Sequence, residues 1–227
     1  MSILKVAQST LPTRHGIFDI HIYRDSETRH EHIVLTTGTP RSGCLARVHS
    51  ECATGDIFGS LRCDCGEQLA ISLRAIGRAG EGVIIRVRGH EGRGIGLQHK
   101  IAAYALQDLG LDTAQANHHL GFPTDVRRYD AAVAILRDLG LHSVRLMSNS
   151  PDKIQALETG GIRVTERVPI WTQANVHNLR YLQTKRTVMG HYAQVDAGQD
   201  NTGSSDIDCG ASAAIAPESP RHGEGRP

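Results

Sequence analysis

The sequence is poor in aromatic residues and carries almost no net charge. Phenylalanine, tryptophan and tyrosine make up 4% of its 227 residues, so its core has to consist mainly of aliphatic side chains. Lysine and arginine number 25 against 24 aspartates and glutamates, which leaves a net charge of +1. A nucleic-acid-binding domain usually has a clear basic excess, so this balance argues against nucleic acid as a partner.

Long apolar runs are absent as well. No segment approaches the ~20 apolar residues that a membrane-spanning helix needs. The opening MSILKVAQSTLP lacks the basic start, long apolar stretch and small-residue cleavage site of a secretory signal. We therefore expect a cytoplasmic protein with no membrane partner. An odd number of cysteines, five, fits metal binding or free thiols there better than a disulfide framework.

Large aliphatic side chains become scarce towards the C-terminus. From residue 194 onward only three remain, and such a segment buries too little apolar surface to offset the entropy of ordering it. We therefore predict that residues 194–227 are a disordered tail, which removes Cys209 from any fixed site. Residues 1–193 show no repeat and no linker, and are predicted to form one compact domain.

Apolar periodicity in residues 1–193 predicts a mixed sheet. Alternation at 18–22 and apolar runs at 32–37 and 44–48 predict three early strands with short turns. Beyond Gly66 the pattern changes to helices alternating with strands. Strands are predicted at 83–88, 144–147 and 162–168, and helices around 69–76, 101–109, 132–139 and 151–159. The predicted fold class is α/β (mixed α+β), a single domain with a mixed sheet flanked by helices.

Three cysteines gather in the segment SECATGDIFGSLRCDCG. Cys63 and Cys65 form a C-x-C turn, and Cys52 can return from a neighbouring loop to meet them. Three thiolates among polar neighbours suit zinc, which prefers tetrahedral sulfur and nitrogen coordination. With three protein ligands the fourth position is open to water, whose pKa the metal lowers. Cys44 or His49 could instead supply a fourth ligand and close the site.

Two predicted strand-to-helix turns are candidates for binding phosphate. In GHEGRGIG, residues 89–96, glycines let backbone amides approach an anion and Arg93 adds a guanidinium. Its spacing matches neither the dinucleotide fingerprint nor the Walker motif, so a plain turn is the alternative. The turn SNS, residues 148–150, precedes Lys153, a charge that a helix start disfavours unless an anion is nearby. Solvated surface residues are the alternative for Lys153 and for Arg47.

Charged and aromatic residues elsewhere are ambiguous by themselves. Asp125 and Arg127 belong to PTDVRRYD, whose simplest interpretation is an ion-paired helix start. Tyr104 lies in a predicted helix whose apolar positions are otherwise aliphatic, so it could be a core residue with a locally bonded hydroxyl.

Together these motifs resemble the GTP cyclohydrolase II family, which catalyses the first committed step of riboflavin biosynthesis. The resemblance covers residues 34–190 and is carried by RVHSECATGDIFGSLRCDCGEQL, HEGRGIGLQHKIAAYALQDLGLDT, ANHHLGFPTDVRRYD and SNSPDK, in that order. It implies zinc-dependent hydrolysis of GTP to formate, pyrophosphate and 2,5-diamino-6-ribosylamino-4(3H)-pyrimidinone 5′-phosphate. It also implies one Zn²⁺ per subunit, Mg²⁺ with the triphosphate, and a homodimer.

The same resemblance assigns roles to individual residues. Asp125 matches the family's proposed general base, Arg127 the residue proposed to attack the α-phosphorus, and Tyr104 a residue implicated in purine-ring chemistry. Its zinc ligands match Cys52, Cys63 and Cys65. Its nucleotide-binding positions match Arg47, Val48, His49, Ser50, Glu51, Gln68, Glu91, Gly92, Arg93, Thr113, Ser148 and Lys153.

Some positions depart from the family pattern. Ser148 stands where relatives commonly have threonine, which retains a hydroxyl, and Val126 and Arg128 stand where some relatives have acidic residues. Arginine is protonated at all relevant pH, so charge stabilisation is physically easier for Arg127 than nucleophilic attack. Two alternatives stay open: a paralogue that opens the imidazole ring but retains the formyl group, and a non-catalytic zinc module that binds nucleotide or a partner.

Overall fold

A computed structural model describes residues 2–192 of the chain; the tail predicted at 194–227 lies outside this part. Its strands are β1 (Ile3–Thr13), β2 (Gly16–Asp25), β3 (Glu31–Thr37), β4 (Leu45–Ser50), β5 (Gly82–Val87), β6 (Ser143–Met147) and β7 (Arg163–Val168). Its helices are α1 (Ala53–Asp56), α2 (Cys65–Ala79), α3 (Gly96–Asp108), α4 (Thr113–His119), α5 (Asp130–Asp138), α6 (Pro151–Thr159) and α7 (Leu179–Thr187), with a 3-10 turn η1 (Glu91–Arg93).

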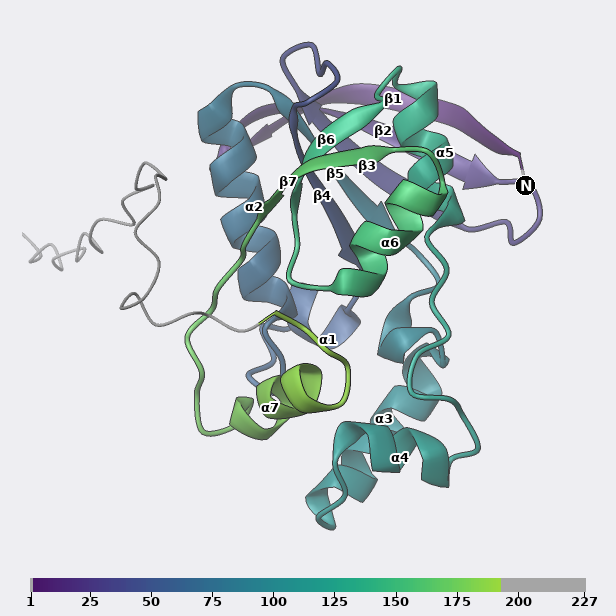
Figure 1. Ribbon diagram of the computed structural model, residues 1–227, viewed down its shortest axis with the longest axis vertical. Helices are drawn as coiled ribbons and strands as arrows, with labels where there is room; N and C mark the ends of the chain where they lie inside the picture. The colour runs from purple at the N-terminus through teal and green to yellow at the C-terminus, as the bar shows by residue number, and fades with distance from the viewer. Residues whose placement is uncertain (1, 193–227) are drawn as a thin grey trace, which may run out of the picture. The chain divides into compact units, whose positions relative to one another are not determined.

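Within residues 2–192 the strands form a seven-stranded sheet in the order β1-β2-β3-β5-β4-β6-β7 (Figure 1). β1, β2, β3 and β5 pair antiparallel, beginning with a hairpin that pairs Thr13 with Gly16. β5, β4, β6 and β7 pair parallel, because helical crossovers separate them in the chain. The predicted mixed sheet is therefore confirmed. The parallel strands end at one edge, where α/β sheets commonly bind ligands.

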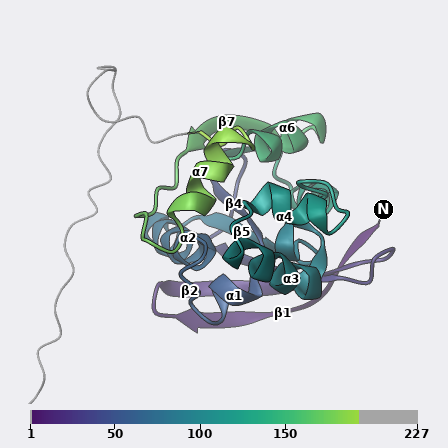
Figure 2. The same cartoon turned by 90° about the horizontal axis from the view of Figure 1, so that it is seen from below.

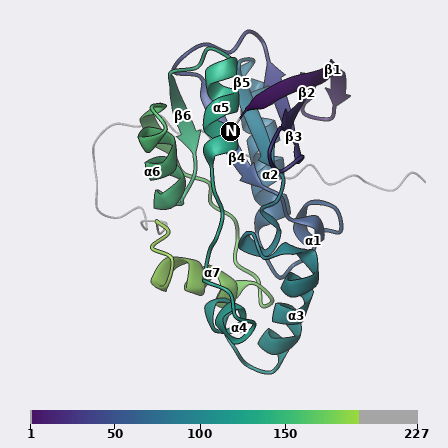
Figure 3. The same ribbon diagram turned by 90° about the vertical axis from the view of Figure 1, so that its right-hand side faces the viewer.

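Helices cover both faces of the sheet, as Figure 3 shows. On one face Ile76 of α2 packs in the same cluster as Ile84 of β5. On the other, Leu136 of α5 and Leu157 of α6 pack with Ile85, the next residue of β5. Successive side chains of a strand point to opposite faces, so the central strand has to be apolar at both positions. The core is mainly aliphatic, as the composition predicts.

The remaining helices gather beyond the carboxyl edge of the parallel strands. Figures 1 and 2 show α1, α3, α4 and α7 on this side of the sheet, where α3 packs on α4 and α4 on α7. The periodicity did not predict β1, α1, α4 and α7. In the described range 2–192, no helix is long and apolar enough to cross a bilayer.

His32 of β3 should make the stability of the fold depend on pH. The residue is 2% exposed, and its Nδ1 accepts a hydrogen bond from the Arg88 backbone N–H at 3.1 Å. Burial lowers the pKa of His32 from 6.5 to about 4. The unfolded chain binds this proton at a higher pH, so the contribution is present above pH 6.5 and is lost as the pH falls towards 4.

We expect His32→Asn, which retains an acceptor, to reduce the loss of unfolding free energy between pH 7 and pH 5 by about 2 kcal/mol. Urea unfolding of both proteins at the two pH values measures this difference. The two proteins differ only at residue 32, so a difference between their pH dependences is due to His32. An identical pH dependence of the two proteins would contradict the assignment.

Candidate functional site

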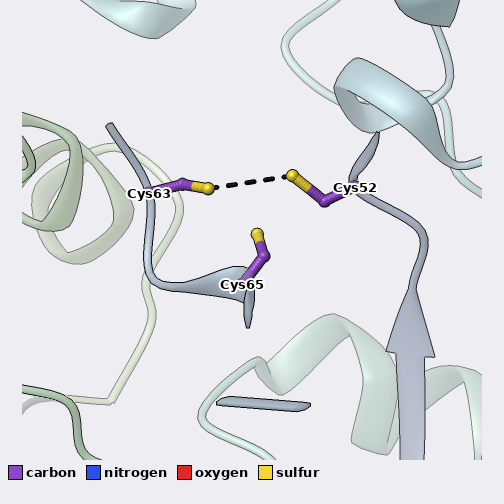
Figure 4. A group of neighbouring side chains, drawn as sticks. All are labelled: Cys52, Cys63 and Cys65. Carbon is purple, nitrogen blue, oxygen red and sulfur yellow. Dashed lines mark hydrogen bonds between the residues drawn. The ribbon is translucent and has the colours of Figure 1, made fainter. Parts of the chain in front are cut away.

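The three predicted cysteine ligands meet beyond the end of β4, as Figure 4 shows. Cys52 caps the N-terminus of α1, where its Sγ accepts a hydrogen bond from the Gly55 N–H at 3.4 Å; Cys65 begins α2, and Cys63 lies in the loop between. The three Sγ atoms lie within 4.8 Å of one another, and those of Cys52 and Cys63 are 3.7 Å apart. Sulfurs on a tetrahedral zinc at ~2.3 Å are about 3.8 Å apart, so the arrangement fits this metal.

Two glycines allow the cysteine segments to approach this closely. A Cβ built on Gly55 would lie 2.9 Å from the Cys63 Sγ and 3.2 Å from the Cys52 Sγ. A Cβ on Gly66 would lie 2.3 Å from the carbonyl oxygen of Gly55. Side chains at either position would therefore push α1 and the start of α2 apart.

The two candidates for a fourth protein ligand have other partners. Nε2 of His49 lies 3.0 Å from the Asp56 carboxylate, which also accepts the Cys52 backbone N–H at 3.1 Å. Cys44 packs against the core on the α5 and α6 face, and burial raises the pKa of its thiol to about 11. Of the side chains described, only the three cysteines form a group that could hold a metal. The geometry favours an open site.

Lys100 and Glu91 hold the cysteine segment from the other side. The Lys100 ammonium donates to the Cys52 Sγ at 3.1 Å and to Glu91 Oε1 at 2.5 Å, while Glu91 Oε2 accepts the Ala53 N–H at 2.6 Å. The Cys63 and Cys65 thiols, followed by Lys100, hold the pKa of Cys52 far below its usual range. The thiolate is the form that binds metal, so this arrangement prepares Cys52 as a ligand.

A pocket opens beside the cysteines. We call it the thiol pocket; its lining includes Cys52, Cys63, Cys65, Arg62, Glu91, Tyr104 and Thr113. The Tyr104 hydroxyl is 3.3 Å from Thr54 Oγ1, and the Arg62 guanidinium carbon lies 4.7 Å from the centre of the Tyr104 ring. Tyr104 therefore belongs to the site rather than to the core.

A second pocket adjoins the first and is lined by basic side chains. We call it the cation pocket; it is formed by Arg47, Arg93, Arg127, Lys153 and Lys185 together with Gln68, Ser148, Ser150 and His191. Arg47 and Lys153 are 4% and 6% exposed, so they are not the surface residues of the alternative interpretation. Arg47 donates to the Met147 carbonyl and to Gln68 Oε1, and Lys153 donates to the Val48 carbonyl at 2.9 Å.

Arg93 is buried without a hydrogen-bond partner for the outer nitrogens of its guanidinium. Its backbone has a φ of +68°, between Gly92 at +60° and Gly94 at +96°, and the residue is 8% exposed. In the described part of the chain, neither Nη1 nor Nη2 finds a hydrogen-bond partner. A buried guanidinium is costly unless an anion accepts its hydrogen bonds, so this residue indicates an anionic ligand.

Arg127 lies where the two pockets meet. It forms an ion pair with Asp125, whose Oδ1 accepts its Nε–H at 2.9 Å, and its Nη1 donates to Ser50 Oγ at 3.2 Å. Burial alone would raise the pKa of Asp125, but the Arg127 guanidinium holds it below its usual range. Burial lowers the pKa of Arg127, yet Tyr129 and Asp125 raise it further, so the net shift is upward.

Most of the predicted site residues come together in these two pockets. The thiol pocket also includes Ser50, Glu51 and Gly92, and the cation pocket also includes His49. Val48 and Asp125 line neither pocket. The Val48 carbonyl accepts a hydrogen bond from Lys153 of the cation pocket, and Asp125 pairs with Arg127, which lines both pockets. Glu51 is already bound by Arg86 and Arg88. The roles assigned by resemblance stay predictions.

Sequence reasoning missed several residues of the site. Lys100 could have been found from its spacing, because it precedes Tyr104 by one helical turn and shares its face. Three further pocket residues lie after β7, outside the motifs of the sequence analysis: Tyr181, Lys185 and His191. Tyr181 lines both pockets, and the Arg93 guanidinium carbon lies 5.9 Å from the centre of its ring.

Comparison with known proteins gives consistent matches. The family model described as GTP cyclohydrolase II matches residues 4–169. GTP cyclohydrolase-2 of Azotobacter vinelandii is 52% identical over 193 residues, which cover 84% of this chain and 92% of that protein. That of Shewanella pealeana is 49% identical over 193 residues, with the same coverage of 84% and 92%.

Longer relatives match as well. The riboflavin biosynthesis protein RibBA of Nocardia farcinica is 48% identical over 213 residues, which cover 93% of this chain and 50% of that protein. The chain thus spans about half the length of the RibBA relatives that it matches.

Proposed function

The chain belongs to the GTP cyclohydrolase II family, and we propose that it hydrolyses GTP to 2,5-diamino-6-ribosylamino-4(3H)-pyrimidinone 5′-phosphate, formate and pyrophosphate. This reaction is the first committed step of riboflavin biosynthesis. The observation that carries the proposal is the junction of the two pockets at Ser50, Arg93 and Arg127. A thiol cluster that could hold a metal reaches from one pocket to the junction, and a set of basic side chains lines the other pocket, as a nucleotide with a reacting base would require.

The three cysteines would hold the zinc ion. Zinc bound there supplies Lewis-acid chemistry and an activated water for hydrolysis at the guanine carbon between the two imidazole nitrogens. Lys100 and Glu91 keep Cys52 in place through the contacts of 3.1 and 2.5 Å. The thiol pocket then accommodates the base, with Tyr104 and Thr113 in its wall.

The cation pocket would take the triphosphate. Arg47, Arg93 and Lys153 are buried there, and Arg93 has free hydrogen-bond donors. We propose that Mg²⁺ accompanies the triphosphate and neutralises part of its charge. Arg127, at the junction, would face the α-phosphate and stabilise the charge that develops as pyrophosphate leaves. Its ion pair with Asp125 favours the protonated guanidinium.

The direct test is to incubate the purified protein with GTP and Mg²⁺ and to identify the products by mass. We expect formate and pyrophosphate in equal amounts together with the diaminopyrimidinone phosphate. Pyrophosphate without formate would indicate the paralogue that retains the formyl group. GTP binding with neither product would indicate a non-catalytic zinc module.

Tyr104→Phe should affect the ring reaction more than the phosphate reaction. The change removes the hydroxyl 3.3 Å from Thr54 Oγ1 in the thiol pocket and leaves the cation pocket untouched. We expect formate release to fall by about 10²-fold, the usual size of such a contribution, while pyrophosphate release falls much less. Parallel assays of both products measure the ratio.

Tyr23→Phe is the matched control for this change. It also removes one buried hydroxyl, which donates to Asp138 at 2.7 Å, but it lies in the core of the sheet. The control should keep the ratio of formate to pyrophosphate at one. An equal ratio in the Tyr104 variant would contradict a specific role in the ring reaction.

We further propose a homodimer that acts in the cytoplasm. Exposed apolar side chains between α1 and α2 support the dimer: Ile57, Phe58 and Leu61 are 67%, 79% and 59% exposed. A second copy of the chain that covered them would remove this surface from water. Light scattering of the purified protein tests the stoichiometry, and a monomer at working concentration would contradict it.

A further inference from the structure

One wall of the cation pocket comes from α7 and the residues that follow it. This segment lies beyond residues 4–169, which the family model matches, and it brings Tyr181, Lys185 and His191 to the pocket. None of the three was among the nucleotide-binding residues expected from the sequence. This wall closes the pocket, and its side chains are candidates for binding the ligand.

Lys185 is held at the pocket by two contacts. Its Nζ lies 2.6 Å from Asp64 Oδ1, and it lies 4.7 Å from the centre of the Tyr181 ring. Asp64 also accepts a hydrogen bond from Gln68 Nε2 at 2.7 Å. These contacts fix the ammonium group beside the cation pocket with one carboxylate to neutralise it.

His191 is fixed in the pocket through the backbone. Its N–H donates to the Lys185 carbonyl at 3.0 Å, and the next N–H, of Tyr192, donates to the Asn149 carbonyl at 3.0 Å. The segment is therefore attached both to α7 and to the loop between β6 and α6. The imidazole faces Lys185 of α7, Lys153 of α6 and Arg127, with Asp64 as the nearby carboxylate.

The pocket carries more positive charge than its neighbours compensate. Five basic side chains of the described residues line it, whereas Asp64 is bound to Lys185 and Asp125 to Arg127. Burial, followed by the charges of Lys185, Lys153 and Arg127, lowers the pKa of His191 to about 3. Such repulsion between fixed cations is relieved when a multiply charged anion enters.

The way in which the two pockets overlap sets the direction of the ligand. The residues that line both pockets are Ser50, Cys65, Arg93, Arg127 and Tyr181. Under the proposed function, the first phosphate lies at this junction. Lys153, Lys185 and His191 line the cation pocket but not the thiol pocket. They therefore line the part of the site away from Cys52 and Cys63, while Cys65 lies at the junction of the two pockets.

We propose that Lys185 and His191 bind the two terminal phosphates of the nucleotide, so that α7 forms part of the polyphosphate site. This inference rests on the proposed GTP substrate. The wall contributed by α7 then discriminates between nucleotides by the number of their phosphates. A triphosphate reaches Lys185 and His191, and a monophosphate does not.

Binding of inorganic tripolyphosphate and of GMP to the metal-loaded protein tests the proposal by calorimetry. We expect Lys185→Gln and His191→Gln to weaken tripolyphosphate binding by about tenfold each, as loss of a charge-assisted or buried polar contact does. Binding of GMP should change less than about twofold, because its single phosphate stays at Arg127. The KM for GTP should rise with that loss, and kcat should change less.

Two further variants separate binding from a purely structural role. Arg186→Gln removes the same charge from the exposed side of α7 and should leave the affinities for both probes unchanged. Asp64→Asn removes the ion pair but keeps Lys185, so it should not weaken tripolyphosphate binding. If Asp64→Asn reproduces the loss seen with Lys185→Gln while its metal content and its GMP affinity stay unchanged, Lys185 is only a latch for α7 and the proposal is wrong.

The other outcomes are also decisive. Unchanged tripolyphosphate binding in both the Lys185 and His191 variants would overturn the proposal even if the wild-type protein hydrolyses GTP. Parallel losses for tripolyphosphate and GMP would overturn it as well, since they would indicate general damage. If the wild-type protein makes no product yet binds tripolyphosphate through Lys185, the anion site stands and the proposed function fails.

Discussion

Replacement of Cys63 with serine should release the metal and abolish formate production without unfolding the protein. The Sγ of Cys63 lies 3.7 Å from that of Cys52, and a serine hydroxyl is a far poorer zinc ligand than a thiolate. The residue lies in the loop between α1 and α2, outside both core clusters, so the sheet and its helices keep their packing. We expect formate release to fall by about 10³-fold or more.

The measurements are bound zinc by elemental analysis, circular dichroism for the fold, and formate for activity. Cys44→Ser is the matched control, because that thiol is packed against the core and its raised pKa of about 11 keeps it protonated. The control should retain zinc and turnover. Full activity of the Cys63 variant would exclude the metal centre, and its unfolding would indicate a structural metal instead.

The strands of the sheet could be predicted wherever they are buried. β5 lies at the centre of the sheet and carries Ile84 towards one core and Ile85 towards the other, so its sequence is a continuous apolar run. β1 escaped prediction because most of its side chains are exposed, and one of them, Pro12, is unusual in a strand. β1 is an edge strand that pairs only with β2, so its stability does not require apolar and polar residues to alternate along it.

The order of the strands could not be predicted from local patterns. β3 is followed in the chain by β4 but pairs with β5, because β4 inserts between β5 and β6. This pairing depends on contacts between residues far apart in sequence. A periodicity of two residues identifies a strand but not its neighbours.

The cysteines of the site could be predicted because their residue type and spacing are unusual. The cations could not, since a lone arginine or lysine is most often at the surface. Burial of Arg47 and Lys153 arises only when β4, β6 and α6 come together around them. α7 is largely polar, and Thr184 is its one buried residue, so the sequence has no apolar stripe from which this helix could be predicted.

Arg127→Lys should retain a measurable part of pyrophosphate release, whereas Arg127→Met should lose it almost completely. Lysine keeps the positive charge at the junction of the pockets but loses the fork that pairs with Asp125 and Ser50. A charge that stabilises a phosphoryl-transfer transition state contributes about 10³- to 10⁵-fold to the rate. We expect the methionine variant to lose that factor and the lysine variant about 10²-fold, in a pyrophosphate assay at saturating GTP.

A nucleophilic role for Arg127 predicts a different pattern. The attacking nitrogen would have to be unprotonated, yet Tyr129 and the Asp125 carboxylate keep the pKa of the guanidinium above its usual value despite burial. A lysine ammonium beside the Asp125 carboxylate stays protonated and has no lone pair with which to attack phosphorus, so under this mechanism both variants would lose pyrophosphate release to the same degree. The Arg128 side chain is 84% exposed and pairs with Asp130. Arg128→Met therefore removes a charge next to Arg127 in the sequence and should leave the rate unchanged. The separation between the lysine and methionine variants, measured against this control, therefore decides between charge stabilisation and covalent attack.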